Sequence, residues 1–398
     1  MADAAPTTAV AEPRSPVDPV EGAKRKWPRA ALALPGLFTL ALLLLAEGVV
    51  RLTLSRVDSL DVFVRLPLMH SDLADRSKAG IFEGDPLLFW RLKRNLKDVV
   101  WDYTVVSTNA DGLRAERPLG TKAAGSVRIL CLGDSVTFGF RVPLVFPSAP
   151  NSYDRSEAPY PALLDRWLKL ANPGRAVEVV NMGVPGYSSR QALAWLRRDI
   201  TRLQPDLVTI CVGWNDVSPR ERPDRVSMPM GAGHVLARQV VGSSQLLLRA
   251  SLAAMGVGRW LPRSRSSEVL APRVTDTEFV GNVIAAARVA RAHGAEVVVL
   301  APIFGGGPTP STEMSLVRIY RAELGLAAPR EGIAFLEVPE LTEAAFPQNA
   351  AYFPVEAIHP GSKGHRLLAR ALLRRLEEEG MLRSLGLSAP PAEMRESP

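Results

Sequence analysis

Short apolar runs alternate with longer amphipathic stretches from about residue 127 to the C-terminus. Five of these runs have the length and composition of buried strands, at residues 127–132, 177–181, 206–212, 295–301 and 333–338. A chain that alternates strands with helices forms right-handed crossovers and a parallel sheet covered by helices on both faces. We therefore predict an α/β fold with a five-stranded parallel sheet.

The segments between the runs carry helical signals. Apolar residues recur every three or four positions over residues 160–170 and 190–203. The sequence Thr-Asp-Thr-Glu at residues 275–278 is a capping box, which predicts a helix running to about His293. A last helix is predicted over residues 363–379.

The N-terminal part carries a different pattern. Residues 30–46 are apolar, residues 48–50 extend the stretch, and basic residues lie just upstream, at Lys24, Arg25, Lys26 and Arg29. About 20 apolar residues can cross a bilayer, and basic residues favour the cytoplasmic side. We predict a single-pass transmembrane signal-anchor at residues 24–52, with a disordered cytoplasmic tail at 1–23 and an extracytoplasmic main domain. A cleavable signal peptide and a buried core helix are the alternatives.

The remaining chain divides into a connecting segment at 53–126, the sheet domain at 127–384 and a disordered tail at 385–398. In the connecting segment, short strands are predicted at 85–90 and 102–107, with turn residues Asn109-Ala110-Asp111-Gly112 between them. We expect this segment to form a small β-containing cap on the sheet domain, with no catalytic residue of its own.

Two stretches fall outside the alternation of strands and helices. Residues 217–274 are too long for a simple loop and contain an apolar helical candidate at 235–255. Residues 140–159 are rich in Pro and Ser. Such insertions act as lids or specificity walls, or they are exposed embellishments, and the sequence does not choose between these.

Composition and charge exclude several classes of function. The net charge of +7 comes from scattered arginines without a nucleic-acid-binding motif, so we expect no nucleic-acid partner. The five histidines and two cysteines show no metal-binding spacing, and we expect neither a metal nor a cofactor. Cys131 and Cys211 lie inside apolar runs and are predicted to be buried free thiols.

Polar residues with catalytic potential follow the predicted strands. Ser135 follows the first strand, Gly186 the second and Asn215 the third, and His359 comes after the fifth. If the strand order is 2-1-3-4-5, the first three strand ends are neighbours at the switch point of the sheet. We therefore expect these segments to converge on one side of the sheet.

The chemistry of acyl transfer requires each of these residue types. A serine hydroxyl needs a base to remove its proton, and His359 is the candidate base for Ser135. The backbone N–H groups of Ser135 and Gly186 and the side-chain amide of Asn215 could form an oxyanion hole. Glu356, three residues before His359, could orient the imidazole. As structural alternatives, Ser135 could cap a turn and His359 could simply begin a helix.

Four sequence blocks carry a resemblance to a known family. They are Gly-Asp-Ser-Val-Thr-Phe-Gly at 133–139, Asn-Met-Gly-Val-Pro-Gly at 181–186, Gly-Trp-Asn-Asp at 213–216, and His359-Pro360. In this order they resemble the SGNH hydrolases, the GDSL-type esterase/lipase superfamily, over roughly residues 127–380. The resemblance implies a flavodoxin-like three-layer α/β/α fold and hydrolysis of esters or thioesters through an acyl-serine, without a metal. The family usually has an aspartate where this chain has Glu356.

The sequence thus predicts a membrane-anchored serine esterase acting on carboxylic esters or thioesters. Its export suggests O-acyl groups on envelope glycans or lipids as substrates, and Trp214 and Tyr187 are possible substrate contacts. A polysaccharide O-acetyltransferase with the same nucleophile and a catalytically silent envelope binding module are the alternatives.

Overall fold

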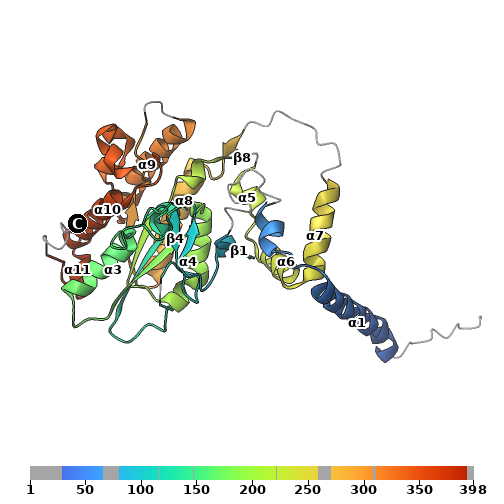
Figure 1. Cartoon of the computed structure of the whole chain (residues 1–398). Coiled ribbons are helices and arrows are strands. Elements are labelled where there is room, and N and C mark those ends of the chain that lie inside the picture. Colours follow the sequence, from blue (N-terminus) through green and yellow to red (C-terminus); the bar gives the residue numbers. More distant parts are fainter. Residues whose placement is uncertain are drawn as a thin grey trace, which may run out of the picture. The chain divides into compact units, whose positions relative to one another are not determined.

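The computed structural model describes residues 29–65, 80–115, 117–146, 148–220, 222–258, 270–307 and 311–391 (Figure 1). The chain divides into two compact units, one ending at Leu54 and the other beginning at Ser55. The predicted tail at 1–23 and the C-terminal residues from 392 onward lie outside the described residues.

The described part of the first unit is one helix. α1 (Arg29–Thr53) has 25 residues, which corresponds to a length of about 37 Å. Its segment Ala33–Thr53 is long and apolar enough to cross a membrane, judged by length and composition, and a signal sequence would meet the same criteria. The structure therefore confirms an apolar N-terminal helix of membrane-spanning length.

The second unit is built on a five-stranded parallel sheet. In spatial order its strands are β6 (Val177–Gly183), β5 (Val127–Gly133), β7 (Leu207–Cys211), β10 (Glu296–Leu300) and β11 (Ala334–Leu336). Numbered along the chain, this order is 2-1-3-4-5, the order of flavodoxin-like folds. Each strand overlaps one of the five apolar runs, so the predicted α/β architecture is confirmed.

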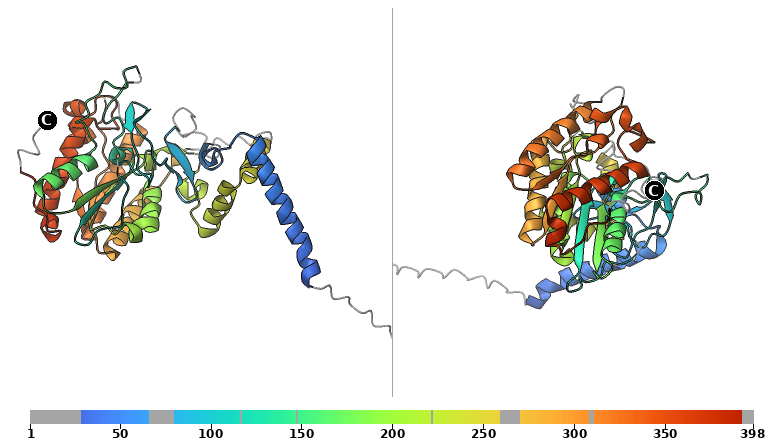
Figure 2. Two further views of the ribbon diagram at one scale, coloured as in Figure 1. Left: turned by 60° about the horizontal axis from the view of Figure 1, so that its bottom comes forward. Right: turned by 90° about the vertical axis from the view of Figure 1, so that its left-hand side faces the viewer.

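Helices cover both faces of the sheet and bury a separate core on each. α3 (Tyr160–Ala171) and α10 (Ser362–Glu378) lie on one face, and α4 (Ser189–Leu203) and α8 (Asp276–Ala292) lie on the other (Figures 1 and 2). Alternate residues of β5 point to opposite faces. Leu130 and Leu132 therefore pack in the core with α4 and α8, whereas Ile129 and Cys131 pack with α3 and α10.

Most of these helices match their sequence signals. The predicted capping box of α8 is present, because Thr275 Oγ1 accepts from the Glu278 N–H and the Glu278 carboxylate accepts from the Thr275 N–H. One helix carries no sequence signal used above: α9 (Thr312–Arg330), which packs against α8 and β11.

The described chain also contains several shorter elements. They are η1 (Asp61–Arg65), α2 (Ser135–Phe138), η3 (Asn215–Val217), η4 (Pro339–Leu341), η5 (Glu343–Ala345), η6 (Gln348–Tyr352) and α11 (Met381–Ser384).

The connecting segment forms two hairpins that share the core of the sheet domain. β1 (Phe82–Asp85) pairs with β2 (Phe89–Leu92), and β3 (Val99–Trp101) pairs with β4 (Thr104–Val106), both antiparallel. The strand predicted at 85–90 is wrong. The Asp85 carboxylate accepts from the N–H groups of Leu87 and Leu88 at 2.9 and 2.8 Å, and this turn joins β1 to β2.

The prediction that the turn residues at 109–112 separate the two strands of the connecting segment is also wrong, since they follow β4. Buried side chains of both hairpins, among them Phe82, Trp90 and Trp101, belong to the core that lies under α4 and α8. The segment is thus an integral part of the folded unit.

The insertion at 217–274 is closed at its base by a short antiparallel pair, β8 (Pro219–Arg220) and β9 (Ala271–Pro272). Between them lie α5 (Asp224–Ser227), α6 (Ala232–Ser243) and α7 (Gln245–Gly258). The single helix expected over 235–255 is therefore two helices. Ser244 interrupts the helical backbone, and its hydroxyl accepts from the Leu247 N–H at 3.1 Å, as a residue preceding a helix does.

The two cysteines are buried and free, as the sequence predicts. Cys131 lies in β5 opposite Thr209, and Cys211 lies in the neighbouring strand β7 opposite Gly133. Burial raises the pKa of the Cys131 thiol to about 12.

The close approach of α2 to β6 depends on Gly183. A Cβ at this position would lie 2.0 Å from the backbone nitrogen of Phe138, and a backbone atom cannot move aside cheaply. We predict that Gly183→Ala lowers the free energy of unfolding by at least about 2 kcal/mol, measured by chemical denaturation of the full chain in detergent. Gly174→Ala is the control, since its added Cβ meets nothing within 4 Å. Equal stability of the two variants would contradict the prediction.

Candidate active site

Ser135, Gly186 and Asn215 all lie beyond the carboxyl ends of parallel strands. Ser135 begins α2 just after β5, Gly186 lies in the loop after β6, and Asn215 begins η3 after β7. β5 lies between β6 and β7 in the sheet, so the loops of both neighbours lie beside the end of β5. This edge is where open α/β sheets bind ligands.

His359 reaches Ser135 from the segment that precedes α10. Its Nε2 lies 2.8 Å from Ser135 Oγ, and its Nδ1 lies 2.6 Å from Oε1 of Glu356. Both distances are those of hydrogen bonds. A hydroxyl, an imidazole and a carboxylate in this series can transfer a proton from the hydroxyl to the ring. The side chain of glutamate is therefore long enough to reach the imidazole from position 356.

Arg141 is a further member of this group, and it is not among the residues predicted from the sequence. Its Nη1 donates to the same Glu356 oxygen, Oε1, at 2.6 Å. Its guanidinium lies 4.7 Å from the centre of the Phe140 ring, and the Phe140 and His359 rings are 4.5 Å apart. Burial alone would raise the pKa of Glu356, but its hydrogen bond and electrostatic interaction with His359 and the positive charge of Arg141 outweigh this effect, so the pKa is lowered. The carboxylate is thus kept ionised.

The turn that carries Ser135 is held by buried polar contacts. Asp134 precedes α2, and its carboxylate accepts from the Val136 N–H at 2.9 Å. Burial raises the pKa of Asp134 to about 7. At the other end of α2, the half-buried Arg114 donates from its guanidinium to the carbonyls of Phe138 and Gly139. Arg114 comes from the connecting segment, which therefore helps to position the serine.

The three candidate oxyanion donors belong to Ser135 itself and to the loops after the two neighbouring strands. Among the residues that the structure describes, no acceptor meets the backbone N–H of Ser135 or of Gly186. Gly186 has a φ of +83°, a conformation that glycine adopts without strain. The Asn215 amide donates to the Tyr187 carbonyl at 3.1 Å and makes a longer contact, 3.4 Å, with Asp134. The first contact fixes the plane of the amide, and the second is at the long end of the hydrogen-bond range.

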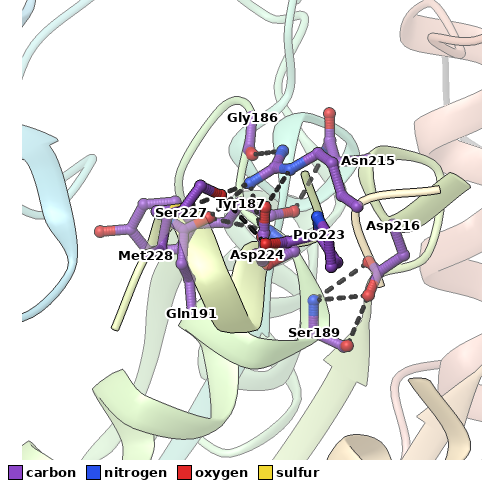
Figure 3. A network of polar contacts seen from close by, with 12 residues as sticks. Gly186, Tyr187, Ser189, Gln191, Asn215, Asp216, Pro223, Asp224, Ser227 and Met228 are labelled. Atoms are coloured by element: carbon purple, nitrogen blue, oxygen red, sulfur yellow. Dashed lines mark hydrogen bonds and ion pairs between the residues drawn. The ribbon is translucent and has the colours of Figure 1, made fainter. Parts of the chain in front are cut away.

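Asp216, next to Asn215, anchors the start of α4. Figure 3 shows its carboxylate against Ser189, whose N–H and hydroxyl both donate to it, at 3.1 and 2.5 Å to Oδ1. Burial raises the pKa of Asp216 to about 7. Because Asp216 and Asn215 are adjacent, this contact ties the loop after β7 to the loop after β6.

The two side chains predicted as substrate contacts differ in their surroundings. Tyr187 is fully buried, its hydroxyl donates to the Trp90 carbonyl at 2.6 Å, and its ring packs edge-on against Trp90 and Trp195. Its side chain therefore points into the core. Trp214 is half-buried and packs on Phe304, with ring centres 5.8 Å apart.

Several residues that support the site come from distant segments. Trp90 and Arg114 belong to the connecting segment, and Arg273 lies at the end of the insertion. No local pattern marks these residues, since their contacts arise from tertiary packing. Arg141 had a local signal, because it lies six residues after Ser135.

A cavity of about 390 Å³ lies elsewhere, between α4 and the connecting segment. Arg91, Arg198 and Arg202 line it, and they pair with Glu83, Asp85 and Asp111, respectively. In the part of the chain that the structure describes, no group of His, Cys, Asp and Glu residues could hold a metal ion.

The sequence of the chain matches a known protein family. The sequence model of the GDSL-like lipase/acylhydrolase family matches residues 131–367, more than half of the chain. No curated protein matches the chain.

The chain is also similar to solved structures, at low sequence identity. LAE5, an α/β hydrolase from the metagenome of Lake Arreo in Spain, is 20% identical with a TM-score of 0.42, over 64% of this chain and 97% of LAE5. The acetylxylan esterase Axe2 from Geobacillus stearothermophilus is 18% identical with a TM-score of 0.42, over 67% of this chain and 97% of Axe2. The lipase/acylhydrolase from Enterococcus faecalis is 18% identical with a TM-score of 0.39, over 67% of this chain and all (100%) of that protein.

The raised pKa of Asp134 predicts a specific pH dependence of stability. The folded pKa of about 7 exceeds the ordinary 3.8, so the protonated carboxyl favours the folded state. This contribution is complete below pH about 4 and is lost as the pH rises through about 7. Between pH 5.5 and 8 the loss should be on the order of 2 kcal/mol.

Asp134→Asn should remove this part of the pH dependence, because an amide oxygen can still accept from Val136 but does not titrate. Unfolding by urea at both pH values, for the wild type and the variant, measures the difference. An identical change in both proteins would show that Asp134 is ionised in the folded state throughout this range.

Proposed function

This chain belongs to the GDSL-like lipase/acylhydrolase family and is an ester-hydrolysing enzyme. On that premise, we propose that it is a membrane-anchored serine esterase in which Ser135 is the nucleophile, His359 the base and Glu356 the orienting acid. The observation that carries the proposal is the continuous hydrogen-bonded series from Ser135 Oγ through His359 to Glu356, at 2.8 and 2.6 Å.

The proposed reaction has two halves. Ser135 Oγ attacks the acyl carbonyl while its proton passes to His359 Nε2, and His359 then gives this proton to the departing alcohol or thiol. Water next attacks the acyl-serine, and His359 accepts a proton from the water. When the tetrahedral adduct breaks down, the carboxylic acid leaves and the proton returns to Ser135 Oγ. No other reactant is needed.

The proposed oxyanion hole consists of the N–H groups of Ser135 and Gly186 and the side-chain amide of Asn215. The negative oxygen of each tetrahedral adduct would accept from these donors, which come from three neighbouring strand ends. Fixed donors need no reorganisation when the charge develops, which makes this kind of stabilisation large. We also assign Trp214, beside Asn215, to the wall of the acyl site.

Glu356 is proposed to keep His359 in the tautomer that carries its proton on Nδ1, so that the unprotonated Nε2 faces Ser135. It would also stabilise the imidazolium formed during the reaction. Arg141 supports this role, since it holds the same carboxylate oxygen at 2.6 Å. The position usually occupied by aspartate in this family would thus be filled by a longer side chain that a second residue restrains.

We place the enzyme at a membrane, with α1 as an uncleaved anchor within residues 24–52. The basic residues Lys24, Arg25, Lys26 and Arg29 before the apolar stretch support a cytoplasmic N-terminus and an extracytoplasmic catalytic domain. An esterase in this location would encounter O-acyl groups on envelope glycans and lipids, and we propose these as its substrate class.

The nucleophile is tested by labelling the full chain with a fluorophosphonate and mapping the modified residue by mass spectrometry. We predict modification of Ser135 and hydrolysis of 4-nitrophenyl acetate by the wild type. Ser135→Ala should lose the label and the turnover. Modification of another serine, or unchanged turnover by Ser135→Ala, would overturn the assignment. Transfer of the acetyl group to an added glycan, in place of acetate release, would reassign the enzyme as an acyltransferase.

The oxyanion hole is tested by Asn215→Ala. We predict that kcat falls about 100- to 1,000-fold with little change in KM, because the donor acts mainly on the transition state. The control is Asn172→Ala, which removes an amide at the end of α3 that contacts the carbonyls of Leu168 and Ser388. A loss confined to KM, or a loss of equal size in the control, would contradict the role.

A further inference from the structure

Three successive carbonyls in the loop after β6 each accept a hydrogen bond from a different part of the chain. The Pro185 carbonyl accepts from Trp90 Nε1 at 3.1 Å, the Gly186 carbonyl from Arg273 Nη1 at 2.8 Å, and the Tyr187 carbonyl from Asn215 Nδ2 at 3.1 Å. Trp90 belongs to the connecting segment and Arg273 to the insertion. Segments outside the strand-and-helix repeat of the domain therefore hold this loop.

The first of these bonds determines the direction of one N–H group. The Pro185–Gly186 peptide unit is planar and trans, so its C=O and its N–H point in opposite directions. Trp90 holds the carbonyl of this unit on the core side. The N–H of Gly186, at the other edge of the same plane, is thereby directed away from the core.

Trp90 is itself held firmly. It is 2% exposed, its ring packs edge-on against Tyr187 with centres 5.6 Å apart, and its own carbonyl accepts from the Tyr187 hydroxyl at 2.6 Å. A Cβ on Gly186 would lie 3.2 Å from the Trp90 ring. Trp90 and the loop thus restrain each other through two hydrogen bonds and a ring contact.

The second bond fixes the next peptide unit. Arg273 is 4% exposed and forms a two-pronged pair with Asp224, which is 2% exposed, with Nε–Oδ1 and Nη2–Oδ2 distances of 3.0 Å. Its Nη2 also donates to Gln191 at 3.0 Å. Figure 3 shows Asp224 and Gln191 in the same network of polar contacts as Gly186. A buried ion pair contributes little net stability compared with apolar packing, so its position against the Gly186 carbonyl indicates a positioning role.

We infer that Trp90 and Arg273 are positioning residues that direct the Gly186 N–H at the developing oxyanion. The inference rests on the proposed function, in which Gly186 is an oxyanion donor. It assigns the connecting segment and the insertion a part in the reaction, since each supplies one side chain that orients the loop.

The test uses Trp90→Phe in the full chain. This change keeps an aromatic ring in the core but removes the N–H that holds the Pro185 carbonyl. We expect kcat on 4-nitrophenyl acetate to fall about 10- to 100-fold, with KM within about twofold of the wild-type value. This loss is smaller than that expected from removing an oxyanion donor, because the Gly186 N–H is still present but less well oriented. The affinity for an alkylboronic acid, which forms a tetrahedral adduct with the serine, should fall by a similar factor.

Trp195→Phe is the matched control. Trp195 lies in the same aromatic cluster, is similarly buried, and its Nε1 donates to Asp199 of its own helix at 2.9 Å, not to the loop. Its kinetic constants and boronate affinity should stay within about twofold of the wild type. Equal losses in both tryptophan variants, or no loss in Trp90→Phe, would overturn the inference.

Arg273→Lys provides a second variant. It keeps a positive charge beside Asp224 but cannot contact Asp224, Gln191 and the Gly186 carbonyl together. We expect the same selective loss of kcat and boronate affinity, and wild-type values would remove Arg273 from the inference. If the wild type neither turns over the ester nor is labelled at Ser135, the proposed function itself fails, a result distinct from either outcome for Trp90.

Discussion

The hydrogen bond between Ser135 and His359 joins residues 224 positions apart, and the fold is arranged so that it can form. β5 lies between β6 and β7 in the sheet, so the serine emerges where the loops of both neighbours meet. His359 comes from the C-terminal part of the chain, just before α10. This helix packs against α3 on one face of the sheet. The site therefore depends on correct packing of the last helix as much as on the turn after β5.

Sequence alone sufficed for the sheet, because buried parallel strands are nearly continuous apolar runs and all five could be located. It also predicted that Ser135, Gly186 and Asn215 follow three neighbouring strands and that His359 follows the fifth, and the structure has them at these positions. It did not locate Trp90, Arg114 or Arg273, whose partners lie far along the chain and depend on packing. The break at Ser244 and the turn at Asp85 were missed because local side-chain hydrogen bonds outweighed the apolar pattern there.

Charge is distributed unevenly around the site. His359 and Arg141 keep Glu356 ionised, whereas burial raises the pKa values of Asp134 and Asp216. Glu356 thus interacts with the imidazole as an anion, and the two aspartates act mainly as hydrogen-bond acceptors for backbone N–H groups. A carboxylate thus supplies negative charge at position 356, whereas at positions 134 and 216 it fixes the geometry of a loop. The surroundings of each carboxylate determine its role.

The burial of Cys131 and Cys211 has a practical consequence for physical studies. These are the two cysteines of the chain, and both thiols are enclosed in strands and free. Maleimide reagents need an accessible thiolate, so the native protein should give almost no background with them. A single surface cysteine could then carry a spin label or a fluorophore, and distances within the folded unit could be measured without first removing the native thiols.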